Sequence, residues 1–325
     1  MRHFINTTFC IVLFLVSGAA FSQRVADNYP SRSIRFVVPL AAGGGTDIIS
    51  RLFAQKLTES WGQQLVVDNR PGAGGLIGAQ IAATAPADGY TMMMVSSSFT
   101  VLPSMYSKMP YDTERDFAPV SRLITFPFLL VTYPSVQAKS AKELIAMANA
   151  KPGSINYASG GSGSAAHLAA ELFKSLSASN FTHVPYKGTG AAITAILSGE
   201  VAFGFYSESS TRDYIKAGRL KVLASTAARR SASLPDVPTI AESALPGYEA
   251  STWAGVLFPS GTPGVIIKKL HADLIRILGM PDMKDKIATL SFQPVGSSPE
   301  EFAATIKSEI VKWGKVVRES GAKVE

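Results

Sequence analysis

Short apolar runs alternate with amphipathic stretches along the first third of the chain. Residues 34–40 are mostly apolar, which is typical of a buried strand. Thr46 or Asp47 then begins a helix whose apolar positions recur every three or four residues. The next strand, helix and strand are expected at residues 64–68, 76–85 and 90–96. This order predicts a parallel sheet with right-handed helical crossovers.

The alternation begins again after an apolar run at residues 117–123. Further strands are expected at residues 128–132, 155–158, 181–186, 201–206 and 220–225, with helices at 141–150, 165–176 and 191–197. An extended run at 250–259 precedes C-terminal helices at 265–278, 283–290 and 299–321. The pattern predicts an α/β fold, and 325 residues are enough for two domains.

Three turns rich in glycine and serine each lie between an extended run and a helical run. They comprise residues 42–47, 159–164 and 187–190. Glycine lets a backbone come close to a ligand, and the start of a helix presents unpaired N–H groups and a positive dipole end. Such turns at the carboxyl ends of strands indicate a site for a small anion, held by backbone and hydroxyl groups.

The N-terminus has the features of a cleavable secretory signal peptide, expected at residues 1–22. Arg2 and His3 form a basic start, residues 9–16 are apolar, and small residues follow. The apolar run is shorter than the roughly 20 residues of a membrane span. Cys10, the only cysteine, lies inside it, so the mature chain has none for disulfides or metal ligation. We expect an exported protein that resides in the periplasm.

The charge of the chain, +7, does not indicate a nucleic-acid interface. The lysines and arginines are scattered and have no interleaved aromatic cluster, which favours a solvated surface that tolerates anionic ligands. The four histidines show no metal-ligand spacing. We therefore expect no metal and no nucleic-acid partner.

Several short motifs follow one another in a characteristic order. They are RFVVP at residues 35–39, GGGTD at 43–47, VVDNRPGAGG at 66–75, ADGYT at 87–91, DFAPV at 116–120 and VPYKG at 184–188. In this order and spacing they resemble the Bug family, the substrate-binding proteins of tripartite tricarboxylate transporters. The resemblance covers essentially the whole mature chain.

The resemblance implies a two-lobe clamp of the periplasmic binding protein type (type II-like). Each lobe would be a mostly parallel sheet flanked by helices, and the chain would cross between lobes near residues 119–123 and 248–253. Lobe 1 is then expected at residues 24–121 plus 252–325, and lobe 2 at 122–251. The clamp would close on a small carboxylate and deliver it, as a monomer without cofactor or catalytic residues, to the membrane subunits of such a transporter.

The candidate ligand-binding residues come from the glycine turns and two neighbouring strand ends. They are Gly43, Gly44, Thr46, Asp47, Ser97, Ser98, Ser159, Gly160, Ser162, Gly163, Ser164, Gly188, Thr189 and Tyr206. Asp47, Ser162 and Ser164 are also suited to cap their own helices. A bare carboxylate at Asp47 would repel an anion, so Asp47 would act through bridging water or accept from the amine of an amino-acid ligand.

Other functions fit the residues less well. The GxGxxA run at residues 161–166 matches a dinucleotide fingerprint, but no acidic residue ends the next strand. Neither a phosphate-binding NTPase loop nor a Gly-x-Ser-x-Gly nucleophile elbow occurs in the sequence. A periplasmic sensor component that uses the same clamp remains an alternative to transport. Dicarboxylates, tricarboxylates, acidic amino acids and aromatic acids are all compatible with the turns.

Overall fold

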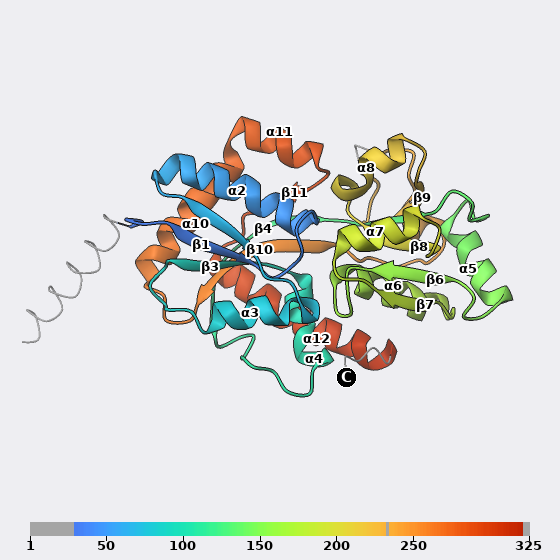
Figure 1. Cartoon of the computed structure of the whole chain (residues 1–325), viewed down its shortest axis with the longest axis horizontal. Coiled ribbons are helices and arrows are strands. Elements are labelled where there is room, and N and C mark those ends of the chain that lie inside the picture. Colours follow the sequence, from blue (N-terminus) through green and yellow to red (C-terminus); the bar gives the residue numbers. More distant parts are fainter. Residues whose placement is uncertain (1–28, 232–233, 321–325) are drawn as a thin grey trace, which may run out of the picture.

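The strands form two sheets that lie end to end (Figure 1). The computed structural model describes residues 29–231 and 234–320, so the expected signal peptide lies outside the described residues. The first sheet has the order β11 (Gln293–Pro294), β4 (Phe117–Phe126), β10 (Thr252–Pro259), β3 (Thr91–Ser96), β1 (Ile34–Val38), β2 (Leu65–Asn69). The second has the order β7 (Thr182–Pro185), β6 (Asn156–Ser159), β8 (Phe203–Tyr206), β5 (Leu129–Thr132), β9 (Lys221–Ser225).

The helices connect these strands. The α-helices are α2 (Gly45–Trp61), α3 (Leu76–Ala83), α4 (Leu102–Met105), α5 (Ala141–Ala150), α6 (Ala165–Ser177), α7 (Thr189–Leu197), α8 (Glu208–Lys216), α9 (Ile240–Ser243), α10 (Gly264–Gly279), α11 (Pro281–Thr289) and α12 (Pro299–Ser320). Two short 3₁₀ helices are η1 (Ala73–Gly75) and η2 (Ser97–Thr100). None of the helices in the described ranges combines the length and hydrophobicity needed to cross a bilayer.

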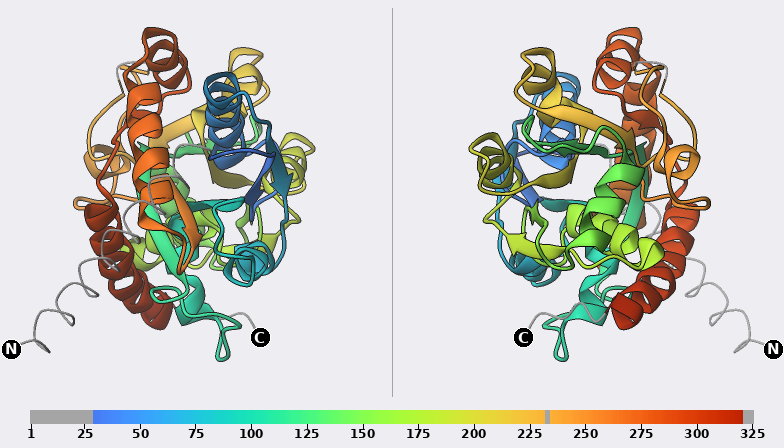
Figure 2. Two further views of the ribbon diagram at one scale, coloured as in Figure 1. Left: turned by 90° about the vertical axis from the view of Figure 1, so that its left-hand side faces the viewer. Right: turned by 90° about the vertical axis from the view of Figure 1, so that its right-hand side faces the viewer.

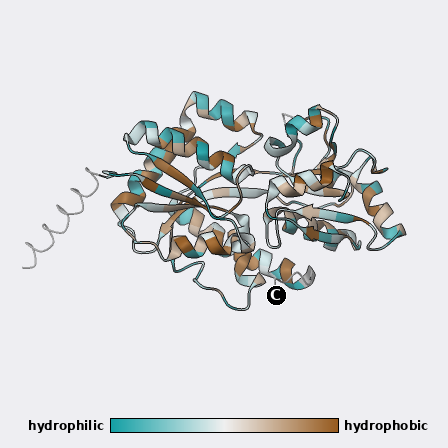
Figure 3. Ribbon diagram, viewed as in Figure 1, coloured by the Kyte–Doolittle hydropathy of each residue, from teal (hydrophilic) through white to brown (hydrophobic). Residues whose placement is uncertain are grey.

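Helices cover both faces of the first sheet. Phe36 on β1 packs in one core cluster with Phe53 of α2 and Leu270 of α10. The next residue, Val37, points to the opposite face and joins a second cluster with side chains of α3 and α12. Both residues are fully buried. In Figure 3 teal and brown segments alternate along many of the outer helices, as expected for helices that bury one face.

The second sheet is built in the same way. Phe205 of β8 packs with the residues of α6 on one face, whereas Tyr206 joins the cluster of α7 on the other. The predicted fold class, an α/β protein with two lobes flanked by helices, is therefore confirmed. α8 is not predicted from the sequence, because seven of its nine residues are polar and only Tyr214 and Ile215 are large and apolar.

Both sheets are mixed, which corrects the expectation that each is mostly parallel. β1 runs parallel to β2 and β3, but β10 runs antiparallel to β3 and β4. In the second sheet β6 is parallel to β7 and β8, and β5 is antiparallel to β8 and β9. The physical reason is the double crossing: β4 leads toward the second sheet, β10 returns from it, and the two lie side by side in opposite directions.

The C-terminal helix α12 contacts both halves of the molecule. Its Trp313 and Val317 share a buried cluster with Met105 of α4 and Leu168 of α6. Figure 2 shows the C-terminal helices, in orange and red, along one side of the molecule in both views. The change of sheet falls between Phe126 and Leu129, and the return between Ser225 and Thr252. The lobe limits expected at residues 121/122 and 251/252 stay a prediction.

Candidate functional site

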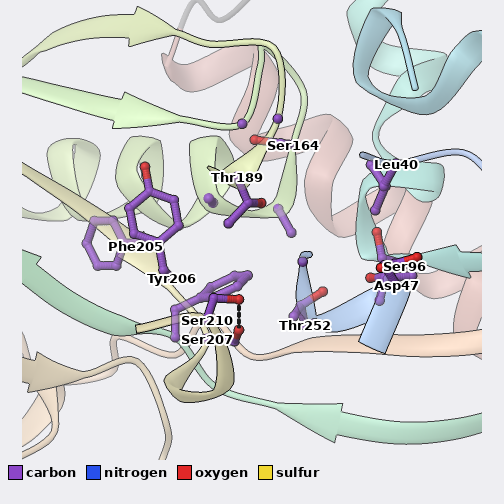
Figure 4. A pocket seen from close by; sticks show the side chains of 18 of the residues that line it. Leu40, Asp47, Ser96, Ser164, Thr189, Phe205, Tyr206, Ser207, Ser210 and Thr252 are labelled. Carbon is purple, nitrogen blue, oxygen red and sulfur yellow. Dashed lines mark hydrogen bonds between the residues drawn. The ribbon is translucent and has the colours of Figure 1, made fainter. Parts of the chain in front are cut away.

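A cavity of about 80 Å³ is lined by residues that follow strands of both sheets (Figure 4). Its volume exceeds what one or two water molecules need, so it can hold a small molecule. The lining residues are Leu40, Ala41, Gly44, Gly45, Thr46, Asp47, Ser96, Phe126, Phe128, Gly160, Ser164, Ala165, Ala166, Gly188, Thr189, Phe205, Tyr206, Ser207, Ser210 and Thr252. The turns β1–α2, β6–α6, β7–α7 and β8–α8 all contribute.

The β1–α2 turn presents the start of a helix to this cavity. Gly43 has φ +85°, which a residue with a side chain rarely adopts. The N-cap of α2 is Gly44, which forms no side-chain cap, so the first N–H groups of α2 are left for another acceptor. The dipole of this helix adds a partial positive charge at the same place.

Asp47 organises this turn and does not cap the helix, because α2 begins two residues earlier, at Gly45. Its carboxylate accepts hydrogen bonds from the Gly43 N–H, the Asn69 amide and the Arg51 guanidinium at 3.0–3.1 Å. Burial alone would raise the pKa of Asp47, but these hydrogen bonds outweigh it and hold the pKa below its ordinary value. The charge of Asp47 is thus balanced within the turn, which lowers its repulsion of an anion.

Two turns of the second lobe meet the β1–α2 turn. A Cβ built on Gly44 would lie 3.5 Å from Oγ1 of Thr189, and one on Gly160 would lie 3.1 Å from the Thr189 backbone nitrogen. A Cβ on Gly188 would lie 2.6 Å from Cβ of Ala41. The absence of side chains at these glycines therefore allows the three turns to converge on one end of the cavity.

The β6–α6 turn has a structural role as well. Ser164 caps α6, because its Oγ accepts from the backbone N–H of His167 at 3.3 Å. His167 in turn accepts the Gly163 N–H at its Nδ1, at 3.1 Å. Ser164 also lines the cavity, and Figure 4 shows it near Thr189. The capping expected for Ser164 is confirmed, and it is compatible with ligand contact.

Another part of the cavity lining is aromatic. Phe126 and Phe128 flank the crossing from β4 to β5, and their rings pack edge to face at 6.0 Å. Phe205 and Tyr206 end β8, and the Tyr206 hydroxyl donates to the Ala158 carbonyl at 2.8 Å. Tyr206 thus offers its ring to the cavity, because its hydroxyl already has a backbone partner.

Eight of the fourteen candidate residues line the cavity, and the other six do not. Those that line it are Gly44, Thr46, Asp47, Gly160, Ser164, Gly188, Thr189 and Tyr206. Those outside the lining are Gly43, Ser97, Ser98, Ser159, Ser162 and Gly163. Most of these six have local partners: the Ser97 hydroxyl bonds Thr252, that of Ser98 bonds Ser96, and that of Ser159 bonds His183. The expected contact of these six residues with a ligand stays a prediction.

Sequence reasoning also missed lining residues. Ser96 ends β3 and lines the cavity, whereas Ser97 and Ser98 belong to η2 and do not line it. Ser207, the N-cap of α8, and Ser210 were missed because α8 itself was not predicted from the sequence. Phe126 and Phe128 could have been found only from their place at the lobe crossing. Among residues 29–231 and 234–320, no three His, Cys, Asp or Glu side chains are grouped to hold a metal ion.

The family model of the tripartite tricarboxylate transporter family receptor matches residues 49–322. The chain belongs to this receptor family. It is 37% identical to Protein BugT of Bordetella pertussis, with 97% of each chain covered. This similarity confirms the resemblance to the Bug proteins.

Two solved structures of relatives have the same fold. The structure of Rpa4515 from R. palustris with adipate has a TM-score of 0.88 at 35% identity and covers 91% of this chain and 100% of its own. MatC from Rhodopseudomonas palustris with bound malate has a TM-score of 0.84 at 30% identity, covering 89% and 100%. Two relatives that share this fold are thus known in complex with small carboxylates, adipate and malate.

Proposed function

We propose that this chain is a periplasmic solute-binding receptor. It captures a small carboxylate between its lobes and delivers it to the membrane subunits of a tripartite tricarboxylate-type transporter. The observation that carries the proposal is the convergence of Gly44, Gly160 and Thr189 on one end of the cavity. Backbone N–H groups and helix starts at that end suit a carboxylate. The family and the two carboxylate-bound relatives support the same conclusion.

We also propose that the protein is exported by residues 1–22, works as a monomer and performs no catalysis. Ser164 is the serine most suited to a nucleophile, but its partner is the backbone N–H of His167. The His167 Nδ1 is occupied by the Gly163 N–H, so this imidazole is not placed as a base for Ser164. The site therefore binds without a cofactor or a reaction step.

A carboxylate panel tests the proposal by thermal unfolding. A ligand at about 100 times its Kd adds about 2.7 kcal/mol of stability, which is easily measured. At least one carboxylate should raise the Tm, whereas its amide and its methyl ester should not. Stabilisation by neutral sugars or cations alone would refute the proposal. Capture of the membrane partner by the tagged, ligand-loaded protein then separates a transporter subunit from a sensor receptor.

A further inference from the structure

The β6–α6 turn contributes Gly160 and Ser164 to the cavity lining, and a histidine fixes the residue before Ser164. The backbone N–H of Gly163 donates to Nδ1 of His167 at 3.1 Å. A backbone N–H can only donate, so this Nδ1 carries no proton and the neutral ring bears its hydrogen on Nε2. A side-chain oxygen of Glu171 lies 3.9 Å from that Nε2 and attracts the hydrogen. His167 is buried, so the Gly163 N–H depends strongly on this one acceptor.

A second histidine fixes the orientation of this ring and the start of the same turn. The rings of His167 and His183 stack with their centroids 4.0 Å apart and their planes at 17°. The ring of Tyr157 extends the stack, 4.8 Å from His183. Nε2 of His183 also lies 2.7 Å from the hydroxyl of Ser159, the last residue of β6. The stack therefore leaves the ring of His167 little freedom to turn away from its bond.

The position of the β6–α6 turn also matters for its contact with the first lobe. A Cβ built on Gly74, in η1, would lie 2.8 Å from the backbone oxygen of Ser162. A Cβ built on Gly163 would lie 3.9 Å from Cγ of Met105 in α4. The first lobe leaves little room on this side, so a shift of the turn would change how the two lobes meet beside the cavity.

We infer that His167 is a positioning residue for ligand binding. Its Nδ1 fixes the Gly163 N–H and thereby the β6–α6 turn, whose residues Gly160 and Ser164 line the cavity. His167 itself does not line the cavity, so it acts through the turn. Without the acceptor, the Gly163 N–H would need another partner, and the turn would lose its fit to a ligand. The inference rests on the proposed function and adds to it a residue that the ligand does not contact.

Two substitutions of His167 separate the acceptor from the ring. The side-chain oxygen of asparagine can take the place of Nδ1, whereas leucine fills the site without an acceptor. Calorimetry measures the affinity for the carboxylate of the panel, adipate and malate included, that the parent protein binds most tightly. His167→Leu should bind it at least tenfold more weakly than the parent protein, and His167→Asn should stay within about threefold. Equal affinities of the two variants would overturn the inference.

Leu144→Ala is the control for a loss of stability alone. Leu144 is fully buried in α5 and does not line the cavity. Its truncation should lower the Tm and leave the affinity at the parent value, measured at a temperature where every variant is folded. If Leu144→Ala weakens binding as much as His167→Leu does, lost stability explains both effects and the inference fails.

NMR of the ring nitrogens provides a test that needs no ligand. At pH 7 the ring of His167 should be neutral, because burial lowers its pKa to about 4, and its hydrogen should be on Nε2. A hydrogen on Nδ1 would exclude the bond from Gly163 and overturn the inference. If a carboxylate binds the parent protein and both variants alike, only the inference fails. If no carboxylate of the panel binds the parent protein, the proposed function fails as well.

Discussion

Gly188 lies at a point where the two lobes meet. Its φ of +106° disfavours any side chain, and an added Cβ would lie 2.6 Å from Cβ of Ala41. We expect Gly188→Ala to lower ligand affinity at least tenfold, because the methyl group holds the β7–α7 turn away from the β1–α2 turn. Calorimetry measures the loss.

Gly190 provides the matched control for this substitution. It lies two residues further along, in α7, and an added Cβ would meet nothing within 4 Å. Gly190→Ala should keep the affinity of the parent protein. Equal affinity in Gly188→Ala would show that the approach of Gly188 to Ala41 does not matter for binding.

The stacked imidazoles of His167 on α6 and His183 on β7 make the stability of the protein depend on pH. The pKa of His167 is lowered to about 4, chiefly by burial and also by the charge of Lys174. The pKa of His183 is lowered to about 3, again chiefly by burial and also by His167. In an unfolded chain a histidine titrates near about 6.5. Between pH of about 6.5 and 4 the unfolded state therefore binds more protons than the folded state. The contribution of the neutral rings to stability is fully present above pH of about 6.5 and declines as the pH falls toward 4.

The pH prediction is tested by thermal unfolding between pH 7.5 and 4.5. The Tm should fall with pH in the parent protein. His167→Asn keeps an acceptor for the Gly163 N–H, which His167 binds at 3.1 Å, and removes one titrating group. The decline should be shallower in this variant. Parallel curves for the two proteins would assign the acid sensitivity to carboxylates elsewhere.

At the scale of the element, Ser164 at the start of α6 both caps its helix and lines the cavity. Ser164→Ala removes the acceptor for the His167 N–H and should lower the free energy of unfolding by about 1 kcal/mol. It should also weaken ligand binding about tenfold, which is about 1.4 kcal/mol, because Ser164 lines the cavity. Denaturant unfolding and calorimetry measure the two effects separately.

Ser140, the N-cap of α5, is the control for capping alone. Its Oγ accepts from the Glu143 N–H at 3.2 Å and it does not line the cavity. Ser140→Ala should lose similar stability and bind ligand normally. If Ser164→Ala behaves in the same way, Ser164 serves only its helix.

The sequence predicts elements well where local signals agree. The apolar runs and glycine turns locate β1, β3 and β6 to within two residues, because a buried strand and a helix start each leave a local pattern. The helix α8 contains only two large apolar residues, so it was not predicted, and Ser207 and Ser210 were not found. Which serine of a turn faces the cavity depends on the rotation of the backbone, as Ser96 and Ser97 show, and residue spacing does not encode that rotation.

At the scale of the whole molecule, the two-lobe fold could be predicted but the strand directions could not. The helical crossovers require the parallel pairs around β1 and β6. The antiparallel position of β10 between β3 and β4 depends on contacts between residues more than a hundred positions apart, which no local pattern reveals. The same long-range pairing holds the outgoing and returning strands together between the lobes.

Side-chain contacts between α8 and the end of α11 join the two lobes. Arg212 of α8 pairs with Glu208 at 2.8 Å and donates to the Thr289 carbonyl at the end of α11. Ser291, just beyond α11, donates to the Glu208 carboxylate. These bonds join the second lobe to the first, so they form only when the lobes meet. Hinge closure on a ligand is a common motion of such proteins.

Arg212→Ala should therefore weaken closure and lower ligand affinity several-fold. Arg219 is the control, because it lies over the ring of Tyr214 at 5.4 Å, and Arg219→Ala should bind normally.

Small-angle scattering should show a smaller radius of gyration for the parent protein at saturating ligand, and a smaller decrease for Arg212→Ala. An unchanged radius in the parent protein would argue against lobe closure, though not against binding. Equal decreases in parent and variant would mean that closure does not need the bond from Arg212 to the Thr289 carbonyl.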